Sequence, residues 1–449
     1  MTDPNQSLDV ALGKVMVRAG MAGSVVGLER LSGGASMESW AFVCGGEGYV
    51  LRRAASAEVM AGRPLSHAAE AAVIRAAREA GVPAPEIVAE LAPGDGSGSG
   101  FVMRRLPGTA APESALAGNG ARLLGDLGAA LAGVHRIDPA TVDFVPLLDP
   151  AAGVEALAGQ FAEHGGNRPI IALGLAWLRA NLPAPITPRL VHGDFRIGNL
   201  MTEVHDDGPR LAGVLDWELA HRGDFHEDLA YGCMAVWRFG RAARGFGLGS
   251  IDDLLAAYAK AGGAPVDLAR FNFWLVYRTV WWALGCLSMG QTWRSGADRS
   301  LERVVVARRA AEQELDLLLL LEDEAPANER VQPLVADRPD APRSAGEPSA
   351  AEILTAVSEW LGAVKERFAG RERFEHAVAR NALGIVVREL GLRPQAEDRG
   401  LADDILAGRV WLTTPGLLAR LRQAALAKLA ADQPKYPSLA IAREKWQIA

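Results

Sequence analysis

Cysteine is scarce in this chain of 449 residues. The three cysteines are Cys44, Cys233 and Cys286, which lie far apart, and no C-x-x-C pair occurs. A disulfide framework or a thiolate metal site would need more cysteines at closer spacing. The pattern argues against both and predicts a cytoplasmic location, where thiols stay reduced.

An excess of positive charge is also missing. The formal net charge is -7, from 47 Lys and Arg against 54 Asp and Glu. Broad nucleic-acid binding normally needs a basic surface that displaces counterions. We therefore expect no nucleic-acid partner, although a few well-placed arginines would still suffice to bind a phosphorylated small molecule.

Long uninterrupted apolar runs are absent as well. The most apolar stretch, "FNFWLVYRTVWWALGCLSMG" (271–290), carries Arg278 near its middle. A buried helix is favoured over a membrane span. The first 14 residues lack a basic segment followed by an apolar one, so we expect neither a signal peptide nor a membrane partner.

Two kinds of pattern divide the sequence that is present. Residues 22–105 alternate between strand-like runs, such as "SWAFVC" (39–44) and "YVLRRA" (49–54), and one helical run that begins after Ser66 and ends at Gly81. From about residue 113 the periodicity is mainly helical. The segment 322–348 is rich in Pro, Ala and charge, which is typical of a linker. We predict segments 1–105, 106–321, 322–348 (linker) and 349–449 (helical).

The stretch "LVHGDFRIGNLM" (190–201) places Asp194 and Asn199 five positions apart, after a short apolar run. Downstream, "GVLDWE" places Asp216 at the end of a second apolar run, and Glu218 two residues on, on the same face of the expected strand. Phosphoryl transfer needs a carboxylate to orient the acceptor hydroxyl, and oxygen ligands for Mg²⁺. This spacing is the kinase arrangement, with Glu218 as a further candidate ligand.

Together with "YVLRR" and "VLDWELAHRGDFHEDLAY", these motifs resemble the aminoglycoside phosphotransferase and choline kinase family over roughly residues 22–321. The closer resemblance is to the branch associated with acyl-CoA dehydrogenases. It implies an α+β, bilobal protein-kinase-like fold with a small β-rich N-lobe that binds the nucleotide and a large helical C-lobe. A small all-α domain would follow it.

The resemblance also implies roles for individual residues. Asp194 would be the catalytic base, and Asn199 and Asp216 would bind Mg²⁺. Nucleotide-binding roles would belong to three features. Gly33, Gly34 and Ser36 would lie in the phosphate-covering loop, Met103 and Arg105 in the hinge that meets the base, and Glu70 would be the helix glutamate that holds a cation on the strand.

The strand lysine of most kinases is replaced here by Arg52 or Arg53. Strand alternation lets only one of the two point into the cleft, and we favour Arg52 because "VLR" aligns with the family's "VLK". Arginine keeps the positive charge but has a different shape.

Other polar residues near the motifs have more than one interpretation. Arg196 either contacts substrate or pairs with a carboxylate. We expect His192 to be structural, Asp224 and Asp228 to fix loops and cap helices, and His205 and His221 to lie on the surface.

These observations predict a Mg²⁺-dependent kinase that transfers phosphate from ATP, or GTP, to a small-molecule hydroxyl. A hydroxyacyl-CoA-type metabolite is the favoured acceptor. An aminoglycoside phosphotransferase and a nucleotide-binding pseudokinase scaffold are the alternatives. For residues 349–449 our hypothesis is assembly, as a homo-oligomer or with a protein partner.

Overall fold

The computed structural model describes residues 4–31, 37–60, 62–332, 334, 350–392 and 398–447. The chain divides into two compact units. The first comprises Met1–Asp149 with Pro185–Phe271, and the second comprises Pro150–Ala184 with Asn272–Ala449.

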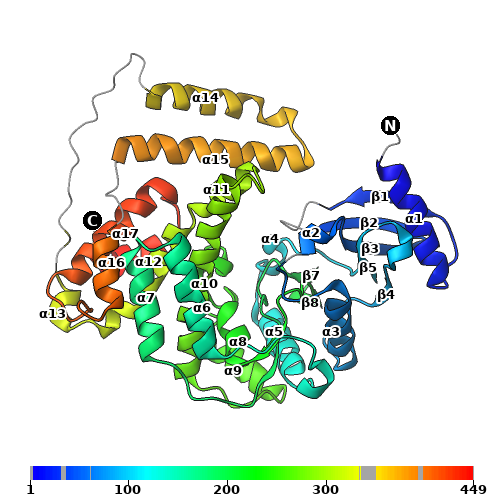
Figure 1. Cartoon of the computed structure of the whole chain (residues 1–449), viewed down its shortest axis with the longest axis horizontal. Coiled ribbons are helices and arrows are strands. Elements are labelled where there is room, and N and C mark those ends of the chain that lie inside the picture. The colour runs from blue at the N-terminus through cyan, green and yellow to red at the C-terminus, as the bar shows by residue number, and fades with distance from the viewer. Residues whose placement is uncertain are drawn as a thin grey trace. The chain divides into compact units, whose positions relative to one another are not determined.

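The first unit contains a five-stranded antiparallel sheet with the strand order β1-β2-β3-β5-β4 (Figure 1). Its strands are β1 (Val25–Arg30), β2 (Glu38–Cys44), β3 (Glu47–Ala54), β4 (Ile87–Glu90) and β5 (Ser99–Arg104). The tight β2–β3 hairpin turns at Gly45 and Gly46, which both have positive φ, as a two-residue hairpin turn requires.

Two helices pack on this sheet. Helix α1 (Pro4–Arg18) buries Leu12 and Met16 in a core with Trp40 and Leu51. Helix α3 (His67–Glu79) begins at Ser66, whose side chain accepts a hydrogen bond from the backbone of Ala69. Because neighbouring strand residues point to opposite faces, the face that meets α1 through Leu51 leaves Arg52 to the other face.

The rest of the first unit carries short helices and two small antiparallel strand pairs. The helices are α2 (Ala57–Met60), η1 (Pro93–Asp95), α4 (Pro112–Ala115), α5 (Ala121–His135), η2 (Pro139–Val142), α8 (His226–Tyr231), η3 (Ala235–Arg238) and α9 (Ile251–Lys260). The strand pairs are β6 (Arg189–Val191) with β9 (His221–Gly223), and β7 (Leu200–His205) with β8 (Gly208–Val214). Strands β6 and β7 enclose the polar stretch 192–199.

Every described element of the second unit is helical. They are α6 (Pro150–His164), α7 (Pro169–Ala180), α10 (Leu268–Arg294, which starts in the first unit), α11 (Leu301–Ala307), α12 (Ala310–Leu321), η4 (Glu322–Glu324), α13 (Ala327–Arg330), α14 (Ala350–Val364), η5 (Lys365–Arg367), α15 (Gly370–Leu392), α16 (Arg399–Leu406), α17 (Leu417–Asp432) and α18 (Ser438–Lys445). Figure 1 shows α14 and α15 side by side as a hairpin. Part of the segment expected to be a linker is folded here, as η4 and α13.

The apolar stretch 271–290 lies within α10, and the side chain of Arg278 is buried there. None of the described helices has an apolar stretch that would reach across a bilayer. All three cysteines are buried and free.

Candidate active site

The stretch 192–199 forms a loop between β6 and β7, and glycine is required near its start. Gly193 has φ +81°, and a Cβ there would lie 2.5 Å from the carbonyl oxygen of Leu219. Only glycine adopts this backbone without strain or clash. The Gly of the His-Gly-Asp motif therefore lets the chain turn closely past the segment that follows Asp216.

Asp228 of α8 fixes this loop from within the protein. Its carboxylate accepts hydrogen bonds from the backbone N–H of His192 (2.7 Å) and of Gly193 (2.9 Å), and lies 3.2 Å from Nε2 of His135. Burial raises the pKa of Asp228, but the hydrogen bond and charge of His135 outweigh it and hold that pKa below its usual value. The expected loop-fixing role of Asp228 is confirmed by these contacts.

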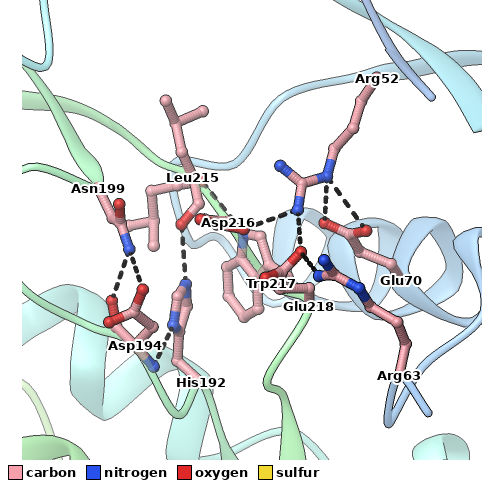
Figure 2. Close-up of polar contacts among 11 residues, drawn as sticks. Arg52, Arg63, Glu70, His192, Asp194, Asn199, Leu215, Asp216, Trp217 and Glu218 are labelled. Atoms are coloured by element: carbon pink, nitrogen blue, oxygen red, sulfur yellow. Dashed lines mark hydrogen bonds and ion pairs between the residues drawn. The ribbon is translucent and has the colours of Figure 1, made fainter. Parts of the chain in front are cut away.

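His192 connects the loop to the Asp216 segment (Figure 2). Its Nδ1 accepts the backbone N–H of Asp194 (3.1 Å), so the ring proton sits on Nε2, which donates to the carbonyl oxygen of Leu215 (3.1 Å). Burial lowers the pKa of His192 and keeps the ring neutral. Its role is structural, as expected.

Two neighbours hold both carboxylate oxygens of Asp194. Asn199 Nδ2 donates to Oδ2 (2.6 Å), and Arg196 Nε donates to Oδ1 (2.9 Å). The Arg196 guanidinium also lies 4.2 Å from the centre of the Trp237 ring. The geometry shows Arg196 paired with a carboxylate, one of its two expected interpretations, and fixes the direction in which Asp194 points.

Arg52 lies at the centre of a second polar cluster (Figure 2). Its Nε lies 3.1 Å from a carboxylate oxygen of Glu70, and its Nη2 donates to Asp216 (2.8 Å) and to Glu218 (2.6 Å). Burial raises the pKa of Glu70 to about 7, and Arg52 only partly opposes this. Arg53 faces the other way and pairs with Glu38 at 2.8 Å.

Sequence reasoning missed Arg63, which also belongs to this cluster. Its Nη1 donates to the same Glu218 oxygen that Arg52 contacts, at 2.8 Å. Burial, followed by the charge of Asp216, raises the pKa of Glu218. Arg63 stands in a loop just before the Ser66 cap, where a lone arginine gives no sequence signal.

The backbone around Asp216 differs from the strand expected there. Strand β8 ends at Val214, and Asp216 has φ +66°, a conformation that costs energy for a non-glycine residue. The expectation that Asp216 and Glu218 share one strand face was therefore wrong. The carboxylates of Asp216 and Glu218 nevertheless both contact Arg52.

A cavity of about 400 Å³ in the first unit brings many of the expected residues together. Its walls include Arg52, Glu70, Met103, Arg105, Asn199 and Asp216, with apolar residues such as Ile74, Phe101, Leu106, Met201 and Leu215. The backbone N–H of Arg105 donates to the carbonyl oxygen of Gly48, and the backbone amide of Arg105 therefore already has a partner within the sheet. Gly33, Gly34 and Ser36 lie outside the described residues.

One expected surface residue proved to be internal. His221 of β9 is buried, and its Nε2 lies 3.0 Å from Glu227. The expectation was wrong because β9 is covered by neighbouring segments, which a short polar stretch does not reveal. His205 is exposed, as expected.

The sequence of residues 27–274, more than half of the chain, matches the phosphotransferase enzyme family. The chain belongs to this family. Residues 366–436 match a separate domain of unknown function, DUF6285. The resemblance recognised from the motifs is thereby confirmed.

Curated relatives of this phosphotransferase-family chain carry acyl-CoA dehydrogenase names. An Arabidopsis thaliana protein named provisionally as the acyl-CoA dehydrogenase IBR3 is 32% identical over 155 residues, covering 28% of this chain and 19% of that protein. Acyl-CoA dehydrogenase family member 10 of Mus musculus is 26% identical over 255 residues, covering 51% of this chain and 23% of that protein. The chain spans about a fifth of the length of these relatives.

Among solved structures, the chain resembles a Ralstonia eutropha protein provisionally named an aminoglycoside phosphotransferase. The TM-score is 0.56 at 21% identity, covering 70% of this chain and 98% of that chain. At this identity the likeness concerns the fold. The predicted kinase-like fold, with an N-terminal sheet, a helical C-terminal region and extra C-terminal helices, is confirmed.

Proposed function

We propose that this protein is an ATP-dependent phosphotransferase, with GTP as a second possible donor, that moves the γ-phosphate to a hydroxyl group of a small molecule. The supporting observation is the position of Asp194. It is oriented by Asn199 and Arg196, and Asn199 also lines the cavity that holds Arg52, Glu70 and Asp216. A base thus stands beside a site suited to phosphates.

In the proposed reaction, the acceptor hydroxyl donates a hydrogen bond to Asp194 and passes its proton to that carboxylate. The hydroxyl oxygen forms a bond to the γ-phosphorus as the bond from that phosphorus to the bridging oxygen breaks. The nucleoside diphosphate leaves with the bonding electrons. Arg52, held by Glu70, neutralises charge on the phosphate chain.

Asn199 and Asp216 have the oxygen donors that suit Mg²⁺. The Asn199 amide nitrogen is committed to Asp194, which leaves its amide oxygen as the donor for a cation. Asp216 lines the same cavity, with 31% of its side chain exposed. A bound Mg²⁺ would supply positive charge to the phosphates. Glu218 is a weaker candidate ligand, since two arginines already share one of its oxygens.

The apolar part of the cavity suits a nucleotide base. Ile74, Phe101 and Leu215 contribute side chains there, and Met103 stands at the end of β5. An apolar lining beside a charged end suits a ligand with an aromatic base and a phosphate tail.

An anionic acceptor is the class that we propose, because arginines are frequent in the sequence that follows Trp237. Trp237, whose ring lies against the Arg196 guanidinium, begins the segment "WRFGRAAR" (237–244), which contains three arginines within seven residues. An aminoglycoside is a polycation and would be repelled. A hydroxyacyl-CoA carries several phosphates, and the relatives' acyl-CoA dehydrogenase names fit such an acceptor.

The test is a measurement of ATP consumption with Mg²⁺ and a panel of hydroxylated acyl-CoA thioesters, with kanamycin as the polycationic comparison. We expect phosphorylation of one or more thioesters and none of kanamycin. Asp194→Asn is the matched control and should abolish transfer. Phosphorylation of kanamycin alone would overturn the acceptor assignment. Failure to bind nucleotide would overturn the function itself, and binding without transfer to any acceptor would favour the scaffold.

A further inference from the structure

Three buried acidic residues of α12 and η4 in the second unit have partners elsewhere in the chain. Glu314, Asp316 and Glu322 are 0%, 6% and 0% exposed, although their neighbours in sequence are mostly leucines. A carboxylate in such surroundings is destabilising unless cations or hydrogen-bond donors surround it. We call these three residues the acidic row.

Glu314 is paired with two cations. Lys428 Nζ lies 2.9 and 3.1 Å from its two oxygens, and Arg168 Nη1 lies 3.0 Å from one of them. Burial raises the pKa of Glu314, but Lys428 and Arg168 more than offset this and hold the pKa below its usual value. The lowered pKa favours the charged carboxylate, whose charge Lys428 and Arg168 offset.

Glu322 has the most partners of the three. Arg422 donates to it through Nε and Nη2, at 3.1 and 2.6 Å, and Trp446 Nε1 donates at 2.6 Å. Lys445 Nζ lies 2.6 Å from its other oxygen. The Arg422 guanidinium also stacks 5.0 Å from the centre of the Trp446 ring, so these groups brace one another.

Asp316 completes the row with neutral donors. The Tyr436 hydroxyl donates to one oxygen at 2.5 Å, and the Ser438 hydroxyl donates to the other at 2.6 Å. Both donors are buried. A water-filled gap between two loosely associated domains would not produce such contacts.

Apart from Arg168, every partner named above lies between residues 422 and 446, on or beside α17 and α18. We propose that α17 and α18 are the obligatory cover of α12, and that the surface they fit is the acidic row of the same chain. The C-terminal helices, including part of the match to the domain of unknown function, are thus a built-in part of the helical region. Leu418, Leu421 and Leu429 of α17 are buried with them.

Polar contacts give this interface its alignment. Leucines alone would let α17 slide or rotate on α12, whereas Glu314 pairs with Lys428 and Glu322 pairs with Arg422 at fixed positions along α17. Burial of the row also makes separation costly, because exposure of α12 and η4 would leave its three acids without their partners.

The test uses the full chain and compares amide hydrogen exchange in the wild type with two variants. Lys428→Met removes one partner of Glu314, and Tyr436→Phe is a milder change at Asp316. We expect exchange to speed up by roughly tenfold or more in α12 and α17 together, since a hydrogen bond to a charge is lost. Glu375→Gln, at an exposed pair with Arg371, is the control and should change neither helix.

Faster exchange in α17 and α18 alone, with α12 as protected as in the wild type, would overturn the proposal. That result would mean that the C-terminal helices form a separate domain. Unchanged exchange in both variants would overturn it equally.

Discussion

The Arg52 cluster and the acidic row are both groups of carboxylates that are held by cations or hydrogen-bond donors, yet they differ in their exposure to solvent. In the row, Glu314 and Glu322 are wholly buried and surrounded by donors. In the Arg52 cluster, the side chains of Asp216 and Glu218 are 31% and 24% exposed, and Asp216 lines a cavity. A closed network stabilises a fold, whereas an open one can exchange partners with a ligand.

The comparison explains why similar residues suit opposite tasks. In the proposed function, the Arg52 guanidinium would leave Asp216 for a phosphate of the nucleotide, and Asp216 would not become a buried unpaired charge, since its side chain is 31% exposed. Arg422 has no such alternative, so its loss would leave Glu322 partly uncompensated. Access to a cavity, more than the number of ion pairs, is our reason for proposing a ligand-binding role for the Arg52 cluster.

The largest effect is expected at Asp194. Asp194→Ala should lower turnover by roughly 10²–10⁴-fold, because proton transfer from the acceptor is lost, while nucleotide affinity largely persists. Steady-state kinetics with calorimetric titration of nucleotide would measure both. Retention of wild-type turnover would remove Asp194 as the base.

Next comes a break in the closed network. Arg422→Gln should reduce the free energy of unfolding by about 3–5 kcal/mol, because Glu322 loses its main cation in a buried setting. Denaturant unfolding of the full chain gives this value. The exposed pair of Arg179 and Glu155 is the control, since Arg179→Gln should cost less than about 1 kcal/mol. Equal losses at both sites would contradict the comparison.

A third prediction separates two carboxylates within the open network. Asp216→Asn should abolish the Mg²⁺ response of nucleotide binding. Glu218→Gln should weaken Mg²⁺ affinity by only roughly tenfold, because Arg52 and Arg63 lose the carboxylate that they share and leave more positive charge beside the cation. Titration of nucleotide binding at increasing Mg²⁺ distinguishes them. If the two variants behaved alike, Glu218 would be a ligand of equal standing.

The smallest effect concerns pH. Burial raises the pKa of Asp432 from 3.8 to about 6, although its pair with Arg308 opposes this. The folded chain therefore holds this proton more tightly, and the contribution to stability is full below about pH 4 and lost as pH rises through 6.

Asp432→Asn should remove about 1–2 kcal/mol of the pH dependence of unfolding between pH 4 and 6. Asp298, whose pKa is lowered to about 2 by its hydrogen bond from Arg303, is the control. Its contribution is already complete above pH 4, so Asp298→Asn should leave the slope unchanged. A steeper slope in Asp432→Asn would show that the sign is wrong.

Local signals predicted local structure well. Ser66 and Gly81 bracket α3, and the Gly45-Gly46 pair turns β2 into β3, because caps and positive-φ turns depend on adjacent residues. The spacing of Asp194, Asn199 and Asp216 also indicated one site. The roles of the site residues stay predictions.

Contacts between distant segments could not be predicted in the same way. Arg63 meets Glu218 across 155 positions, and Glu322 meets Arg422 across 100. The left-handed backbone of Asp216 could not be predicted, because an aspartate after an apolar run looks in sequence like the end of an ordinary strand. These features depend on the completed fold.

The grip of Asp228 on the two backbone amides before Asp194 has a consequence for ligand binding. A loop that is already immobilised loses little freedom when an acceptor arrives, so more of the binding energy remains as affinity. In the proposed reaction, the side chain that rearranges when the nucleotide binds is therefore Arg52, which would exchange the carboxylates of Asp216 and Glu218 for phosphates. The backbone that carries Asp194, the proposed catalytic base, would stay in place.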